Sequence, residues 1–459
     1  MACLTINKGK RKKLAKKDNS HKLVQFCEHN GAKEWGPFFK IRKDIPLIFR
    51  DQKHKMIDEN VSGKLEGEKM ERQFDFLMPS VNFFGPGVIA KIGERAKMLN
   101  MTKVLVVTEK SLTKLDNGPV AQTLASLEAA GVDYVVFDGV EPNPKIRNIK
   151  AGKELYLAQD CDSIITVGGG SSHDCGKGIG IILTNGDDIT KLAGIETLSK
   201  PLPPLMAVNT TAGTGSELTR HAVISNEETH LKFVVVSWRN IPLVSFNDPM
   251  LMLGIPQAIT AATGMDAFVQ AIEPYVSVDH NPITDSQCKE AIQLIQDALP
   301  KAVANGQNVA ARTKMVEAEM LAGMAFNNAN LGYVHAMAHQ LGGQYDAPHG
   351  ICCALLLTTV EEYNLIACPD RFAELAQIMG YDTTGKTTFE AAHLAIEGMR
   401  EMCKAVGIPA SIKEIGAKPA DFELMAENAL RDGNAFSNPR KGTKEEVVAL
   451  YQKAYDGIY

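Results

Sequence analysis

The sequence predicts an α/β N-terminal half with a Rossmann-like parallel sheet, followed by an all-helical C-terminal half. Three observations lead to this prediction. Short β-branched runs alternate with helical patterns from Phe74 to about Pro256. After Pro256 these runs stop, and Ala, Leu, Met, Glu and Gln dominate long amphipathic stretches. A run of three glycines (168–170) directly follows one β-branched run, as expected of a strand-to-helix turn.

Four buried runs are the expected strands: KVLVVT (103–108), VDYVVF (132–137), DSIITVGGG (162–170) and LMAVNTT (205–211). Buried strands that alternate with helices indicate a parallel sheet with crossover helices. The amphipathic stretches predict helices at 256–273, 284–304, 309–328 and 331–341. We place the boundary near the turn at 251–257. The expected domains are therefore an α/β domain at 71–256 and an all-helical domain at 257–459.

The composition excludes several classes of protein. With 459 residues, 45% hydrophobic and 22% charged, the chain has an ordinary globular balance and room for two or three domains. No apolar run approaches the ~18 residues of a membrane span. Nine cysteines form no Cys-x-x-Cys pair, and the adjacent Cys352 and Cys353 suit neither a structural zinc site nor an easy disulfide. Unpaired thiols and the lack of a secretory signal predict a cytoplasmic location.

The first seventy residues differ from the rest. They carry 17 Lys and Arg against 9 Asp and Glu, so the remaining 389 residues have a net charge of −13. Such an acidic body argues against binding nucleic acid through the main surface. We interpret residues 1–70 as a basic, poorly ordered extension, and an arm for nucleic acid or anionic lipid is the alternative. Residues 66–69 can be encoded by purine-only codons, like a bacterial ribosome-binding site. Met70 as the natural start, with 1–69 as translated leader, is therefore a hypothesis.

Two turns that follow expected strands are candidates for binding a phosphate. Gly168-Gly169-Gly170-Ser171-Ser172 opens a helix that should hold Asp174 and Lys177. Glycines let the backbone approach a phosphate, and a helix N-terminus offers free N–H groups, although a simple tight turn explains the glycines equally well. The second turn, 210–217, is rich in hydroxyl groups that could donate to a phosphate or ribose, or cap the next helix. Glu109 follows another strand, where an acid can accept from ribose hydroxyls and repel a 2′-phosphate.

The helical half contains a candidate metal site. Asp266 and Gln270 are spaced i, i+4, as are His335 and His339, so each pair shares a helix face. His349 follows an expected helix break at 342–343. A single buried histidine is usually structural, but three within fifteen residues weaken that interpretation. Carboxylate and imidazole groups together can bind Zn²⁺ or Fe²⁺ and leave room for a substrate.

These residues lie in motifs that resemble the iron-containing (group III) alcohol dehydrogenases, especially NAD-dependent methanol dehydrogenases and 1,3-propanediol dehydrogenases. The resemblance runs from about Phe74 to Tyr459 and implies their dehydroquinate synthase-like two-domain architecture. The matching segments keep their order: FFGPG (83–87), EPNP (141–144), GGGSSHDCGKG (168–178), NTTAGTGSELT (209–219), AATGMDAF (261–268), AGMAFNNANLGYVHAMAHQLGG (322–343), PHG (348–350) and NPRK (438–441).

The resemblance implies NAD between the halves and a divalent metal beneath the nicotinamide, so that 71–256 is a dinucleotide-binding domain and 257–459 a metal-binding domain. The metal positions are Asp266, Gln270, His335 and His349. His339 matches a histidine beside the nicotinamide, the candidate catalytic residue, and Phe326 a wall of the substrate pocket. The remaining candidates for cofactor binding are Glu109, Asn143, Gly169, Gly170, Ser171, Asp174, Thr210, Thr211, Thr214 and Lys232.

Gln270 departs from the family pattern, which is Asp-x-x-x-His. An amide oxygen is a weaker and harder donor than imidazole. The expected ion is therefore Fe²⁺ or Zn²⁺, with Mg²⁺ and Mn²⁺ as alternatives, and Gln270 could reach the metal or only a bound water.

The implied activity is NAD-linked interconversion of primary alcohols and aldehydes. We expect a small-molecule substrate, no nucleic acid, no membrane and a homo-oligomer. One alternative is a lyase like dehydroquinate synthase, which the absence of Lys and Arg between His335 and His349 disfavours. The other is a non-catalytic binding protein that has lost a metal ligand.

Overall fold

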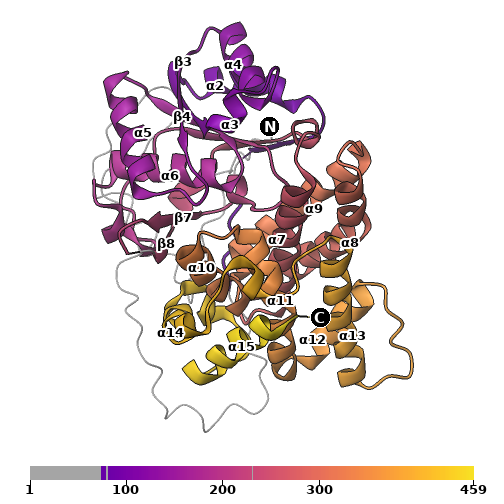
Figure 1. Cartoon of the computed structure of the whole chain (residues 1–459). Coiled ribbons are helices and arrows are strands. Elements are labelled where there is room, and N and C mark those ends of the chain that lie inside the picture. The colour runs from indigo at the N-terminus through magenta and orange to yellow at the C-terminus, as the bar shows by residue number, and fades with distance from the viewer. Residues whose placement is uncertain (1–73, 79–80, 230, 459) are drawn as a thin grey trace, which may run out of the picture. The chain divides into compact units, whose positions relative to one another are not determined.

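The computed structural model describes residues 74–78, 81–229 and 231–458. The basic extension and the Met70 hypothesis lie outside the described residues. The chain divides into residues 1–72 and 73–459, and the second unit contains both halves discussed below. In Figure 1 its α/β half runs from indigo to magenta, and its helical half from orange to yellow.

A six-stranded parallel sheet forms the centre of the α/β half (Figure 1). Four of its strands confirm the expected runs, with slightly different ends, whereas β1 and β9 were missed because four-residue strands show too little periodicity. In spatial order the strands are β1 (Val81–Phe84), β9 (Val244–Asn247), β6 (Leu205–Asn209), β4 (Ser163–Gly168), β2 (Lys103–Glu109) and β3 (Asp133–Val140).

Helices cover both faces of this sheet, because alternate residues of each strand point to opposite sides. Leu105 and Val107 of β2 pack in one core with residues of α5 (Ile146–Ala158) and α6 (Gly170–Thr184). Val104 and Val106 pack in another with α2 (Ile92–Met98) and α4 (Pro119–Ala130). The short α3 (Lys110–Thr113) follows β2 directly. Both cores are rich in buried Val, Ile and Leu, which explains the continuous apolar runs in the sequence.

A second, three-stranded sheet was not expected from the sequence. Its order is β5 (Gly194–Ile195), β8 (Leu231–Val236) and β7 (His221–Asn226), and β7 and β8 pair antiparallel. The side chains of these strands are only partly buried, so their apolar pattern is weak. Residues 216–218 form a single 3-10 turn and not the helix that the second hydroxyl-rich turn could have capped.

The described residues after Asn247 contain no strand, as expected, and form a helical half around one large core. Its helices are α7 (Gln257–Val276), α8 (Pro282–Ala304), α9 (Val309–Ala329), α10 (Tyr333–Tyr345), α11 (His349–Asn364), α12 (Pro369–Ile378), α13 (Thr388–Ala405), α14 (Phe422–Arg431) and α15 (Lys444–Asp456).

The expected helix break at residues 342–343 is wrong. Helix α10 continues through both glycines and ends at Tyr345. Asp346 caps it with φ 51°, and Pro348 then precedes α11. Gly342 serves a close contact instead, because a Cβ there would lie 2.9 Å from Lys232 Nζ of β8.

The segment His349–Ala367 is long and apolar enough to cross a membrane by length and composition, which the sequence reading overlooked. It is 72% buried within the fold. We therefore interpret it as a core helix, because helices that are apolar all round commonly occupy the centre of a large helical core.

Candidate active site

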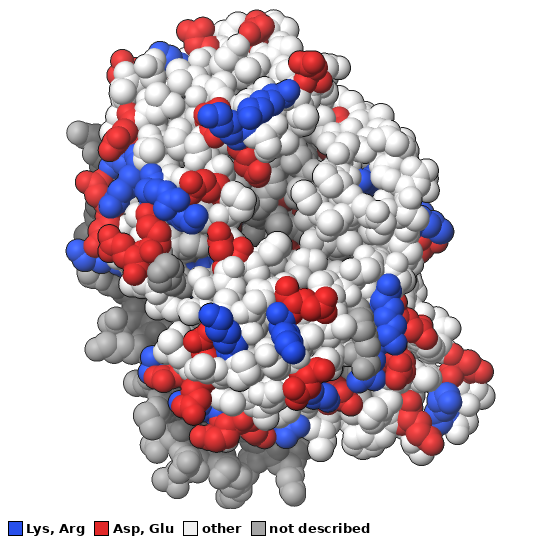
Figure 2. All heavy atoms as spheres, viewed as in Figure 1, with Lys and Arg blue, Asp and Glu red and all other residues white. Residues whose placement is uncertain are grey.

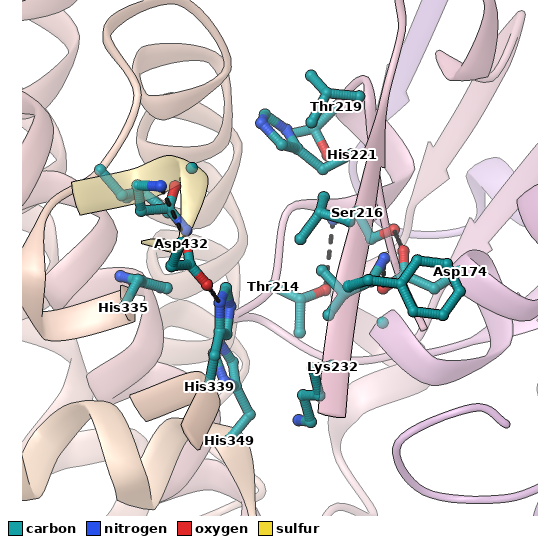
Figure 3. A pocket seen from close by; sticks show the side chains of 18 of the residues that line it. Asp174, Thr214, Ser216, Thr219, His221, Lys232, His335, His339, His349 and Asp432 are labelled. Atoms are coloured by element: carbon teal, nitrogen blue, oxygen red, sulfur yellow. Dashed lines mark hydrogen bonds and ion pairs between the residues drawn. The ribbon is translucent and has the colours of Figure 1, made fainter. Parts of the chain in front are cut away.

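A cavity of about 680 Å³ lies between the α/β and helical halves. The surface is visibly hollowed there in Figure 2, and Figure 3 shows side chains of both halves facing each other across the space. The cavity brings together most of the predicted site residues: Asn143, Gly170, Ser171, Asp174, Thr214, Lys232, Asp266, Gln270, Phe326, His335, His339 and His349. Four others do not line it: Glu109, Gly169, Thr210 and Thr211.

The glycine loop forms one wall. Strand β4 ends at Gly168, whose φ of 152° favours glycine, and α6 begins at Gly170. A Cβ on Gly170 would lie 2.9 Å from Thr214 Cγ2, and one on Gly169 would lie 2.9 Å from Thr211 Oγ1. The glycines therefore let the two predicted turns touch, with Thr211 packed behind the loop. No side chain caps the start of α6, so its N–H groups and positive dipole end can meet an anion.

A buried lysine joins the glycine-loop helix to the second turn. Lys177 Nζ donates to the carbonyl oxygens of Ser216, Thr219 and His221 at 2.6, 3.0 and 2.7 Å. Burial lowers the pKa of Lys177 to about 8. Asp174 accepts from Ser216 Oγ at 2.7 Å and from the Val223 N–H at 3.1 Å, so one oxygen holds the second turn and the other holds strand β7. Asp174 thus lines the cavity, but both its carboxylate oxygens accept hydrogen bonds from within the α/β half.

Asn143 connects the two halves beside the cavity. Its backbone is left-handed, with φ 52°, and its side-chain Nδ2 donates to Asp346 Oδ1 at 2.8 Å. Lys232 Nζ of β8 donates to Asn143 Oδ1 at 2.7 Å. Glu109 lies farther along the sheet edge, at the carboxyl end of β2, where Ser111 Oγ donates to it at 3.4 Å. Burial raises the pKa of Glu109.

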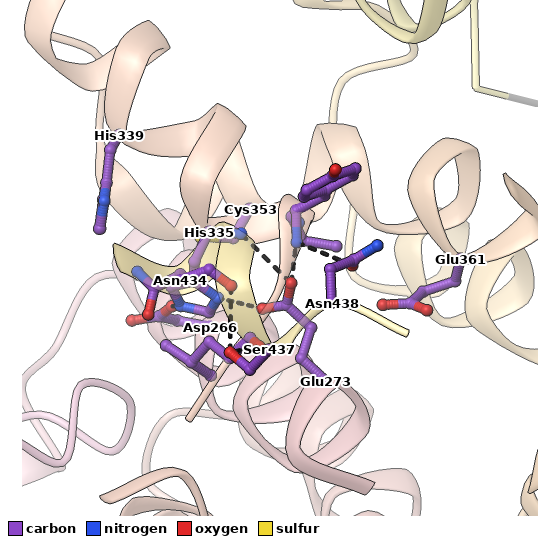
Figure 4. A network of polar contacts seen from close by, with 12 residues as sticks. Asp266, Glu273, His335, His339, Cys353, Glu361, Asn434, Ser437 and Asn438 are labelled. Atoms are coloured by element: carbon purple, nitrogen blue, oxygen red, sulfur yellow. Dashed lines mark hydrogen bonds and ion pairs between the residues drawn. The ribbon is translucent and has the colours of Figure 1, made fainter. Parts of the chain in front are cut away.

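The opposite wall holds the candidate metal ligands. His335 Nε2 of α10 and His349 Nε2 of α11 each lie 3.6 Å from Asp266 Oδ1 of α7. Cys353 Sγ lies 3.7 Å from His349 Nε2, and one donor atom from each of these four residues lies within 4.8 Å of the others. Figure 4 shows Asp266, His335 and Cys353 gathered in this way.

Three side-chain atoms at this wall are buried without a hydrogen-bond partner: Asp266 Oδ1, His335 Nε2 and Gln270 Oε1. An unpaired buried polar atom is costly, and a bound cation would give the two oxygens and the ring nitrogen a partner. Burial and the neighbouring His335 and Lys232 hold the pKa of His349 well below its usual range. The imidazole is therefore neutral, which is the form that binds a metal.

A glycine allows the helices to approach closely enough for this cluster. A Cβ on Gly350, the residue after His349, would lie only 2.1 Å from the carbonyl oxygen of Ala262 on α7. Any larger residue would push α11 away from α7. The spacing of His349 and Asp266 therefore depends on Gly350.

Two carboxylates, the buried Glu273 and the partly buried Asp432, orient two of the imidazoles. Glu273 Oε2 contacts His335 Nδ1, and its Oε1 accepts from the Val334 N–H at 2.8 Å, as Figure 4 shows. Asp432 Oδ2 lies 2.7 Å from His339 Nδ1 (Figure 3). Each pairing leaves the Nε2 atom of the ring available for other contacts. Such carboxylate–histidine pairs fix the ring tautomer and orientation around metal sites.

The sequence reading missed Cys353, Glu273 and Asp432. The i, i+4 spacing of His349 and Cys353 was an available signal, as was Glu273, seven residues after Asp266 on the same helix. Asp432 had none, because 93 residues separate it from His339.

An α/β half with a glycine loop at an uncapped helix start, facing a helical half with a carboxylate–imidazole cluster, is typical of a nucleotide- and metal-binding class of enzyme. Residues 79–249 match the iron-containing alcohol dehydrogenase family, and 260–455 match the C-terminal part of the Fe-containing alcohol dehydrogenase family. The chain belongs to the iron-containing alcohol dehydrogenase family.

Individual relatives agree with this assignment. The 1,3-propanediol dehydrogenase of Citrobacter freundii is 57% identical over 384 residues, covering 84% of this chain and 99% of the relative. The NAD-dependent methanol dehydrogenase of Bacillus methanolicus is 38% identical over 380 residues, covering 83% and 99%. The solved alcohol dehydrogenase from Oenococcus oeni is 77% identical with a TM-score of 0.81, covering 83% and 100%.

Proposed function

We propose that the chain is an NAD-linked, metal-dependent dehydrogenase that interconverts primary alcohols and aldehydes. The observation that carries the proposal is a cavity with an uncapped helix N-terminus on one wall and a carboxylate–imidazole cluster on the other. In this cluster Asp266 Oδ1 and His335 Nε2 have no hydrogen-bond partner. The printed activities of the relatives, on propanediol and methanol, support an alcohol as substrate.

We assign the two walls to two groups. Gly170, Ser171 and Thr214 would hold the pyrophosphate at the start of α6, and Glu109 would accept from the ribose. Gly169, Thr210 and Thr211 would support the loop from behind, and Asn143 and Lys232 would border the cofactor. Asp266, His335 and His349 would hold the metal ion.

The chain's own groups then position the substrate and move a proton. When bound, the ion would supply a Lewis acid and the nicotinamide a hydride acceptor. Phe326 forms an apolar wall against Gly215, and its ring centre lies 5.5 Å from that of His221, which keeps water from this side. His339, held at Nδ1 by Asp432, presents Nε2 to the cavity and can take the proton that leaves the alcohol.

The two alternatives lose support. A lyase acting on an anionic substrate needs several basic groups, whereas Lys232 and Arg431 are the Lys and Arg side chains among the described lining residues, and Lys232 donates to Asn143. A non-catalytic protein would not need the carboxylates of Glu273 and Asp432 that orient His335 and His339.

The expected partners and location remain part of the proposal. On the face seen in Figure 2, basic and acidic side chains of the described residues are interspersed, which disfavours nucleic acid as a partner. The seven cysteines within the described residues are free, in keeping with a cytoplasmic location. We propose a homo-oligomer, which the mass of the native protein in solution would test.

One experiment tests the function. The purified chain is assayed for bound metal and for NAD-dependent oxidation of methanol, 1-propanol and 1,3-propanediol. Asp266→Ala, His335→Ala and His349→Ala should each lose metal and turnover, because two remaining ligands of this set hold an ion poorly. A variant that keeps both at the parent level would remove its residue from the site, and a parent without turnover on any alcohol would overturn the proposal.

A further inference from the structure

Three helices each present an i, i+4 pair at the candidate metal site. Asp266 and Gln270 lie on α7, His335 and His339 on α10, and the third pair is His349 and Cys353 on α11. Cys353 is fully buried, and its Sγ lies 3.7 and 4.0 Å from the two ring nitrogens of His349. The thiol thus belongs to the same cluster as the carboxylate and the two imidazoles.

The spacing fits direct coordination. In a tetrahedral zinc site with bonds of about 2.0–2.3 Å, neighbouring donor atoms lie ~3.3–3.8 Å apart. The separations of 3.6 Å from Asp266 Oδ1 to His335 Nε2 and to His349 Nε2, and of 3.7 Å from His349 Nε2 to Cys353 Sγ, lie in this range. Asp266 Oδ1 and His335 Nε2 are buried without a hydrogen-bond partner, and a cation would supply one.

We propose that Cys353 Sγ is a ligand of the metal ion, and that the four donors Asp266, His335, His349 and Cys353 select Zn²⁺ over Mg²⁺ and Mn²⁺. This rests on the metal site of the proposed function. As the metal–sulfur bond forms, the thiol gives up its proton to solvent. A thiolate is a soft ligand that prefers zinc, whereas hard cations prefer oxygen donors. The Gln270 amide, a neutral oxygen donor, is then a neighbour of the ion and not the fourth ligand.

X-ray absorption of the zinc-loaded full-length protein tests the coordination directly. We expect one sulfur neighbour at about 2.3 Å in the parent and in Cys352→Ser, and none in Cys353→Ser. Cys352 is the matched control, because it is the adjacent, equally buried thiol and lies outside the cluster. The cobalt-loaded parent and Cys352→Ser should show a thiolate-to-cobalt charge-transfer band that Cys353→Ser lacks.

Competition with a chelator gives a second readout. Loss of an outer partner of a ligand commonly weakens metal binding by 10–100-fold, so Cys353→Ser should weaken zinc binding by about 100-fold or more. Cys352→Ser should bind zinc like the parent, and Gln270→Ala should keep the sulfur neighbour.

The outcomes separate this inference from the proposed function. Zinc held in the parent without a sulfur neighbour, or a sulfur neighbour that persists in Cys353→Ser, overturns the role of Cys353 alone. A parent that binds no zinc overturns both this inference and the metal site beneath it. Because the parent spectrum is itself decisive, the inference is tested even if Cys353→Ser fails to fold.

Discussion

Replacing Glu273 by Gln should weaken metal binding without changing any ligand. Glu273 is 1% exposed on α7, and it contacts His335 Nδ1 with one oxygen and the Val334 N–H with the other. Gln has the same shape but only one acceptor oxygen and no charge. If the amide N–H faces His335, the ring must accept at Nδ1 and carry its proton on Nε2, the atom that faces Asp266. That tautomer cannot bind a metal through Nε2.

The size of the effect follows from the two contacts. Disturbing a carboxylate–histidine pair behind a metal commonly costs 10–100-fold in affinity, which is about 1.4–2.7 kcal/mol. A hydrogen bond to a charged group contributes roughly 1.5–3 kcal/mol to folding, and leaving a buried donor unpaired costs a similar amount. We therefore expect weaker zinc binding and a lower melting temperature of the metal-free protein.

Zinc affinity by chelator competition near neutral pH and thermal unfolding of the metal-free protein would measure the two effects. Glu361→Gln is the matched control. Burial, reinforced by the charge of Glu273, raises the pKa of Glu361 to about 8, so this carboxyl is mostly protonated near neutral pH and Gln imitates it. Zinc binding as tight in Glu273→Gln as in the parent would refute the orienting role, as would an equal loss in Glu361→Gln.

The remaining predictions concern cofactor choice, the metal and pH. Glu109→Gly should improve kcat/KM with NADP relative to NAD by about tenfold, because ~1.4 kcal/mol of repulsion towards a 2′-phosphate is removed; an unchanged preference would place Glu109 away from the ribose. Gln270→His adds an imidazole on the face of α7 that carries Asp266, so metal should be retained longer in dialysis against chelator, and equally fast loss would show that position 270 does not reach the ion. Burial raises the pKa of Glu217 to about 7 from an ordinary 4.5, so the folded protein keeps this carboxyl protonated at a pH where the unfolded chain does not. The resulting contribution to stability is complete below about pH 4.5 and is lost as the pH rises through about 7. Glu217→Gln should therefore flatten this decline, measured as the melting temperature from about pH 5 to about pH 8, and a parallel decline in both proteins would contradict it.

Much of the fold was predictable because buried parallel strands leave continuous apolar runs. Strands β2 and β4 are such runs, whereas the four-residue strands β1 and β9 pair with neighbours far along the chain and leave no local period. The three-stranded sheet was not predicted for another reason: its strands are partly exposed and therefore need not be apolar.

The site was predictable where its residues take part in a local sequence pattern, such as an i, i+4 pair or a group of histidines within a short segment. Asp266, His335 and His349 belong to this group. Cys353 was considered only for its spacing to other cysteines, although its spacing to His349 was the informative one. Asp432 reaches His339 through tertiary packing alone, and no local rule could have paired them.

The three carbonyl oxygens around Lys177 have a mechanical consequence. They belong to residues 216–221, which begin at the end of the turn that carries Thr214, and the ammonium belongs to the helix that the glycine loop opens. Lys177 therefore ties the helix that follows the glycine loop to the segment that follows Thr214. A phosphate that contacts Gly170 and Thr214 would meet a preformed cradle and would not have to order it. Little of its binding energy would then be spent on ordering the protein, and more would remain to hold the two halves together around the substrate.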